Sequence, residues 1–76
     1  MSGNREIARL EALAEEAYTA MYDARRPKDY AEDALLNLRR AIDIAEDGGD
    51  QAEVERLTKR HDHIRAVYNS QFRWNG

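Results

Sequence analysis

The sequence predicts an all-α fold, an up-down-up antiparallel three-helix bundle that the whole chain forms as one domain. The single proline, Pro27, and the pair Gly48-Gly49 divide its 76 residues into three segments of similar length, and proline and glycine are the strongest breakers of regular structure. In each segment apolar residues recur at spacings of three and four, which is typical of amphipathic helices. We therefore expect helices over about residues 4–25, 30–47 and 51–72, with short connections that make neighbouring helices antiparallel.

In the first segment the apolar residues form a seam along one side of a helix. Its members are Ile7, Leu10, Ala14, Ala17, Met21 and Ala24. The small side chains of Ala14 and Ala17 allow a second helix to approach closely. Pro27 disfavours helical geometry at Arg26, so we expect this helix to end at about Arg25.

The second segment begins with a capping-box pattern, in which Asp29 is followed three residues later by Glu32. Aspartate replaces the usual Ser or Thr of that motif, and we expect Asp29 to be the N-cap. The seam that follows comprises Ala31, Ala34, Leu38, Ala41 and Ala45. Gly48 is placed to adopt the left-handed conformation that ends a helix.

The third segment repeats the entry pattern, with Asp50 as the expected N-cap and Glu53 three residues later. Its seam comprises Val54, Leu57, His61, Ile64, Tyr68 and Phe72. The apolar spacing thus continues almost to the end of the sequence, which predicts one long third helix.

Charge is distributed unevenly along the chain. Residues 27–50 carry three basic and seven acidic side chains, whereas residues 51–76 carry five basic and three acidic ones. Arg56, Lys59 and Arg60 lie on one face of the third predicted helix, away from its seam. We expect this face to be exposed to solvent, with its basic groups paired to the acidic second helix.

Two stretches of the sequence resemble a known type of helical hairpin. Leu10, Leu13, Ala14 and Ala17 have a spacing similar to that of the first helix of a tetratricopeptide-type repeat, and residues 29–45 look like its second helix. The third segment resembles the start of the next unit, or the last helix of a microtubule-interacting-and-transport-type bundle. Such hairpins bind segments of other proteins, so the resemblance implies a protein-binding role.

The composition excludes several kinds of protein. The chain has no cysteine, which excludes disulfides, thiolate chemistry and cysteine-based zinc sites. No apolar run approaches the ~18 residues of a membrane span, and the first residues lack the apolar core of a signal peptide, so we expect a soluble, cytoplasmic protein that contacts no membrane. Ten of the twelve basic residues are arginine, a usage that often accompanies GC-rich bacterial or phage genomes.

The sequence contains no motif for catalysis or cofactor binding. Ser2 and Ser70 lie near the ends of the chain and outside any nucleophile elbow, and the glycine pair lacks the Lys and the Ser or Thr of a phosphate-binding loop. His61 and His63 are two residues apart, a spacing that directs side chains to nearly opposite sides of a helix. We therefore expect neither an enzyme nor a metal or cofactor site.

His61 nevertheless places a titratable group on an otherwise apolar seam. It acts either in chemistry, as a general base, a metal ligand or a pH-sensitive packing residue, or as a core-edge histidine that is hydrogen-bonded to a neighbouring helix. We favour the structural interpretation, because no second ligand or catalytic group stands at helical spacing from it.

Apolar residues outside the seams are the candidates for binding a partner protein. They are Tyr22, Leu36, Val67 and Trp74. Trp and Tyr are the residue types most enriched at binding hot spots. We therefore expect a small interaction or accessory module that acts by helix-face packing. The thin, alanine-rich core also favours a homodimer in which two bundles share a face.

The alternative function is that of a nucleic-acid-associated regulator. Arg56, Lys59 and Arg60 would then contact phosphate groups. The net charge of −3 and the isoelectric point of about 5.3 disfavour such a partner, because the phosphate backbone attracts positively charged proteins.

Overall fold

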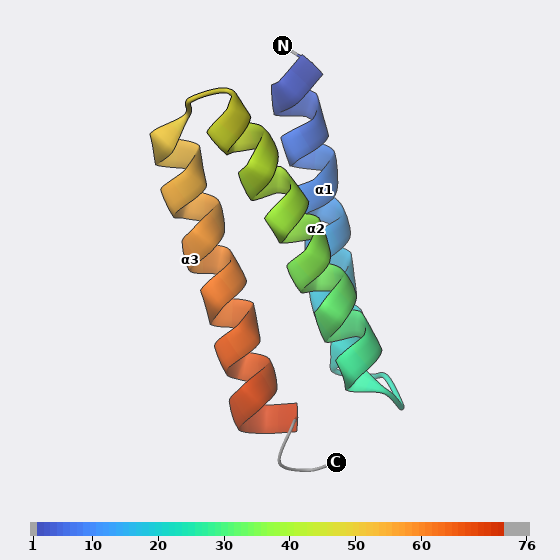
Figure 1. The fold of residues 1–76 in the computed structure, drawn as a ribbon. Coiled ribbons are helices and arrows are strands. Elements are labelled where there is room, and N and C mark those ends of the chain that lie inside the picture. Colours follow the sequence, from blue (N-terminus) through green and yellow to red (C-terminus); the bar gives the residue numbers. More distant parts are fainter. Residues whose placement is uncertain (1, 73–76) are drawn as a thin grey trace.

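The computed structural model describes residues 2–72 and confirms an all-α three-helix bundle. It contains α1 (Ser2–Met21), α2 (Pro27–Asp47) and α3 (Gln51–Val67), followed by one π-helical turn, η1 (Tyr68–Phe72). Helices α1 and α3 run in the same direction along one long axis and α2 runs opposite to them (Figure 1), and the described part of the chain has no strand. The molecule is elongated, with extents of 40 × 17 × 12 Å.

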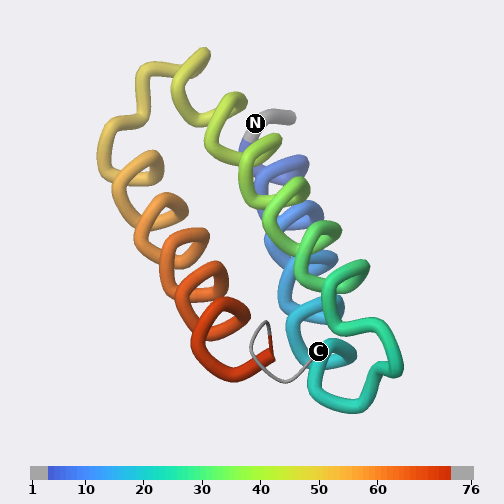
Figure 2. Tube along the Cα trace, turned by 60° about the horizontal axis from the view of Figure 1, so that its bottom comes forward, coloured from blue at the N-terminus to red at the C-terminus, as the bar shows by residue number. Residues whose placement is uncertain are grey.

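The predicted seams meet in the middle of the bundle and form its core. The core cluster consists of Ile7, Leu10, Ala14, Ala34, Leu38, Ala41, Ala45, Leu57 and Ile64. All five predicted seam residues of α2 are buried. Alanines predominate where α1 meets α2, so these two helices pack closely, whereas α3 packs mainly on α2. The path of the chain in Figures 1 and 2 shows the same arrangement.

Helix α1 ends at Met21, four residues earlier than expected. The next residues form tight turns, in which the amides of Tyr22 and Asp23 donate to the carbonyls of Thr19 and Ala20, at 3.3 and 3.2 Å. The reason for the early end is that α2 already begins at Pro27. The reversal between the two helices must therefore fit into residues 22–26.

The start of α2 corrects a second expectation, because Asp29 is not its N-cap. The cap is Arg26, with φ −121° and ψ 78° and without a side-chain hydrogen bond, and Pro27 is the first helical residue. Proline suits that position, since its φ is already helical and the amide it lacks would have no partner there. Asp29 lies in the first turn instead, where a carboxylate interacts favourably with the helix dipole.

The connection from α2 to α3 is a Schellman motif. The amide of Asp50 donates to the carbonyl of Ala45 at 2.9 Å, and that of Gly49 donates to Glu46 at 3.0 Å. Gly49 has φ +71°, whereas Gly48 is right-handed helical with φ −83°. The left-handed residue is therefore Gly49, whereas the sequence had predicted Gly48.

The predicted N-cap of α3 is confirmed. Oδ1 of Asp50 accepts a hydrogen bond from the amide of Glu53 at 3.2 Å. The α-helix continues to Val67, and η1 then extends the helical path to Phe72 with a wider turn. No helix among residues 2–72 is long and apolar enough to cross a membrane.

Candidate functional site

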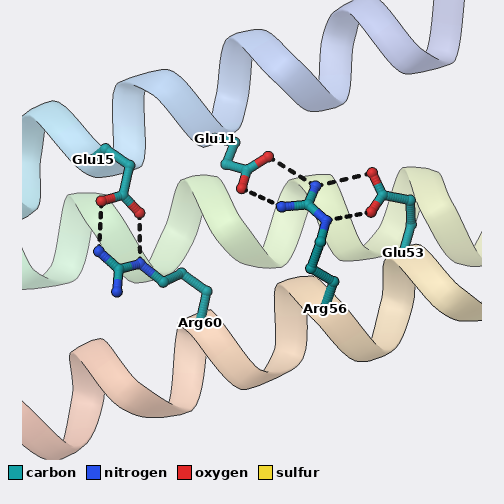
Figure 3. Close-up of polar contacts among 5 residues, drawn as sticks. All are labelled: Glu11, Glu15, Glu53, Arg56 and Arg60. Atoms are coloured by element: carbon teal, nitrogen blue, oxygen red, sulfur yellow. Dashed lines mark hydrogen bonds and ion pairs between the residues drawn. The ribbon is translucent and has the colours of Figure 1, made fainter.

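Long polar side chains fill the space between α1 and α3, the two helices that pack least closely. The guanidinium of Arg56 donates to both carboxylate oxygens of Glu11, at 2.6 and 2.9 Å, and to both of Glu53, at 2.5 and 2.9 Å (Figure 3). One arginine of α3 thus joins a carboxylate of its own helix to one of α1.

A second arginine repeats this contact one turn further along. Arg60 donates to both carboxylate oxygens of Glu15, at 2.7 and 2.6 Å. Its guanidinium also lies over the ring of Tyr18, 5.1 Å from the ring centre, a cation–π arrangement. The two carboxylates and the two arginines are each four residues apart on parallel helices, so the contacts specify one register between α1 and α3.

These ion pairs change the acidity of their members. Hydrogen bonds from Arg60 lower the pKa of Glu15 below its ordinary value of 4.5, and those from Arg56 do the same for Glu53. The pKa values of Arg56 and Arg60 are raised, chiefly by the hydrogen bonds to Glu53 and Glu15. Glu15 and Glu53 are therefore charged at neutral pH and form ion pairs with the two arginines.

Aromatic side chains continue the α1–α3 contact towards the end of the bundle. The rings of Tyr18 and Tyr22 meet edge to face at 5.5 Å, and their hydroxyls are 3.0 Å apart. This hydrogen bond raises the pKa of Tyr18. The rings of Tyr22 and Phe72 also meet edge to face, with their centres 5.2 Å apart. The rings of Phe72 and Tyr68 are stacked, with their centres 6.4 Å apart.

The sequence contains four tyrosines and one phenylalanine, and the structure places all five at the same end of the bundle. The aromatic end, as we call this cluster, comprises Tyr18, Tyr22, Tyr30, Tyr68 and Phe72. It lies where α1 finishes, α2 begins and η1 finishes (Figure 1). Tyr22 is 49% and Tyr30 41% exposed. The opposite end, at Gly48-Gly49, has no aromatic residue in the described chain.

The predicted partner-binding residues do not form one surface. Tyr22 and the half-buried Val67 both lie at the aromatic end. Leu36 is 46% exposed but lies in the middle of α2, on the face opposite its seam. Trp74 lies outside the described residues. The structure thus brings two of the four candidates to one end of the molecule.

Sequence reasoning missed Tyr18 and Tyr30 as members of this cluster. A signal for both was present. Tyr18 and Tyr22 have the i, i+4 spacing that brings side chains together on a helix. Tyr30 lies in the first turn of the next helix, and in an antiparallel hairpin the start of the second helix lies beside the end of the first.

Arg56 and Arg60 of the basic face of α3 are paired, but with α1 and not with α2, so the expected partner was wrong. The reason is the orientation of α3, whose seam packs against α2 and leaves Arg56 and Arg60 on the side of α1. Lys59 is exposed and makes no ion pair within residues 2–72. An open depression on this face has mixed charge and is lined by Glu11, Ala52, Glu55, Arg56, Lys59, Arg60 and His63. The nucleic-acid hypothesis gains no support from this arrangement and stays a prediction.

His61 is buried, with 7% of its surface exposed. Its Nδ1 lies 3.1 Å from Oδ1 of Asp62, the next residue of the same helix. The predicted hydrogen bond to a neighbouring helix was therefore wrong, because the partner is on the same helix. Its Nε2 is buried and has no hydrogen-bond partner among the described residues. Across residues 2–72 no group of three acidic or histidine side chains comes together that could hold a metal ion.

Comparisons with protein-family models, with curated protein sequences and with solved structures found no match. The resemblance to tetratricopeptide-type hairpins therefore stays a prediction.

Proposed function

We propose that the protein is a small helical interaction module that binds another protein through the aromatic end and catalyses no reaction. The observation that supports this proposal is the gathering of every described aromatic ring at one end, with Tyr22 and Tyr30 nearly half exposed. Tyrosine is enriched at binding hot spots because it offers a large contact area and a polar tip.

The contacts of Tyr22 suit it to act as an anchor. Its ring packs against the rings of both Tyr18 and Phe72, and its hydroxyl bonds to that of Tyr18. A side chain held in this way loses little conformational freedom on binding, which reduces the cost of association. Val67 adds a half-buried apolar group at the same end.

Leu36 is a weaker candidate for such an anchor. Its neighbours one turn away on α2 are Glu32, Asp33, Arg39 and Arg40, so it is a single apolar side chain among charges. Isolated exposed leucines are ordinary on protein surfaces. Leu36 therefore serves as a control for the proposal.

Site-specific photo-crosslinking in the native cell tests the proposal. A benzophenone amino acid replaces Tyr22 in one strain, Leu36 in a second and Asp47, at the opposite end, in a third. We expect the Tyr22 position alone to give a discrete crosslinked protein band, which Tyr30→Ala in the same chain weakens. Equal crosslinking at all three positions, or a discrete band only at Leu36 or Asp47, would reject the aromatic end as the binding surface.

A further inference from the structure

We propose that the groove which α1 and α2 form for α3 also accepts the α3 of a second copy of this chain, so that two copies exchange their third helices. The groove is the face of α1 and α2 that carries Leu10, Ala14, Leu38 and Ala41. This inference goes beyond the proposed function and does not depend on it, because the exchanged helix leaves the aromatic end assembled.

The first argument is that α3 contributes the fewest buried residues to the core, although Leu57 and Ile64 are among the largest fully buried side chains. Its buried residues are Leu57, His61 and Ile64, whereas α2 alone contributes five. One of the three is a histidine whose buried Nε2 has no partner among residues 2–72, and an unpartnered buried polar atom opposes burial. α3 is therefore the helix that separates from the bundle most easily.

The second argument is that the contacts between α1 and α3 specify a partner without holding it firmly. The side chains of Arg56 and Glu15 are 50% and 41% exposed, and those of Glu11 and Arg60 are 26% and 35% exposed. Ion pairs that water reaches in this way stabilise modestly. Their spacing is nonetheless specific, because Arg56 and Arg60 face Glu11 and Glu15 in one register. Any copy of α3 carries the same two arginines.

The distribution of charge also favours the α3 of a second copy as the occupant of the groove. Residues 1–50 carry seven basic and twelve acidic side chains, whereas residues 51–76 carry five basic and three acidic ones. The acidic hairpin therefore attracts the third helix of any copy of the chain, and it repels a second hairpin.

The third argument is the hinge. Only Gly48, Gly49 and Asp50 join α2 to α3, and the reversal depends on the positive φ of Gly49. Opening this one turn releases α3 without disturbing either helix. The exchanged pair then remakes every contact between α3 and the hairpin, so it loses only the turn. In the closed chain the short linker keeps its own α3 near the groove at an effective concentration in the millimolar range. The α3 of a second copy competes with it, so we expect exchange only at high protein concentration.

Two alanine variants at the hinge test the exchange. Gly49→Ala strains the closed turn, since left-handed geometry is unfavourable for residues with a Cβ, and exchange relieves this strain in both chains. We expect the association constant for dimer formation of the Gly49→Ala chain to be at least about tenfold above that of the wild type. Gly48→Ala is the control, because Gly48 is right-handed and a Cβ there would lie 3.5 Å from the carbonyl oxygen of Ile44, an ordinary contact. Sedimentation equilibrium over a concentration series measures both.

A charge-reversal pair distinguishes exchange from any other dimer. One chain carries Glu11→Arg and Glu15→Arg, and the other carries Arg56→Glu and Arg60→Glu. Each chain alone opposes like charges across α1 and α3, but exchange in the mixture restores both interfaces. We expect a mixed dimer, or folding of the mixture where neither chain folds alone.

Two results would overturn the proposal. The first is a Gly49→Ala chain that stays monomeric at every concentration. The second is a Gly49→Ala dimer without any mixed species of the charge-reversed chains, because the copies would then associate through another surface.

Discussion

At the scale of single residues, His61 is the one seam position whose chemistry conflicts with its surroundings. Leu57 and Ile64, its neighbours along the seam of α3, are fully buried and have no polar side-chain atom. His61 is almost as buried, satisfies only Nδ1 through Asp62, and leaves Nε2 without a partner in the described chain. A buried acceptor or donor without a partner costs about 1–3 kcal/mol.

Replacing His61 by leucine should therefore stabilise the protein. His61→Leu places an apolar side chain of similar size at the seam and removes the unpartnered nitrogen, so we expect the free energy of unfolding to rise by about 1 kcal/mol. His63→Leu is the matched control, because His63 is exposed and its replacement should change stability by less than about 0.5 kcal/mol. Urea unfolding followed by circular dichroism measures both. A His61→Leu variant no more stable than the wild type would show that His61 has an uncounted favourable contact.

At the scale of the elements, periodicity predicted the helices and the sides they bury, because burial of one apolar face follows directly from the spacing of Ala31, Leu38 and Ala45. It did not predict where helices begin and end. The start of α2 was set by competition between two valid signals, and the fixed φ of Pro27 prevailed over the capping side chain of Asp29. The partners of Arg56 and Arg60 were missed as well, since they depend on the rotation of α3 against α1.

The ion pair of Glu15 makes the α1–α3 contact sensitive to acid. The pKa of this carboxyl is lowered in the folded chain by its hydrogen bonds with Arg60, so the unfolded chain binds the proton more readily. The stabilisation is therefore fully present above pH about 4.5 and is lost as the pH falls through the folded pKa. Because the side chain is 41% exposed, we expect its contribution to stay below about 1 kcal/mol.

Thermal unfolding at pH 7 and pH 3 measures this contribution. We expect Glu15→Gln to lower the melting temperature at pH 7 and to approach the wild type at pH 3. Glu16→Gln is the control, since Glu16 is exposed and makes no ion pair within residues 2–72, and it should match the wild type at pH 7. A Glu15→Gln variant as stable as the wild type at pH 7 would mean that the ion pair contributes nothing.

At the scale of the whole molecule, the bundle is a close hairpin of α1 and α2 with a more weakly attached third helix. The sequence predicted the three-helix bundle, and its candidate contact residues included Tyr22 of the aromatic end and Val67 at the same end of the molecule. It did not predict the difference between the helix pairs, because that difference depends on which side of α3 faces α1. Alanine seams bring α1 and α2 together, whereas α1 and α3 meet through arginines, glutamates and aromatic rings.

This difference predicts that α3 opens before the rest of the bundle unfolds. Native-state hydrogen exchange should show the amides of α3 exchanging together, with an opening free energy below that of the amides around Leu38 and Ala41 in α2. Raising the salt concentration from about 0.05 to 0.5 M should lower the protection of α3 further, since salt screens exposed charges. In Glu11→Gln/Glu15→Gln chains the same salt change should have a smaller effect. Equal protection of all three helices at both salt concentrations would show instead that the bundle opens only as a whole.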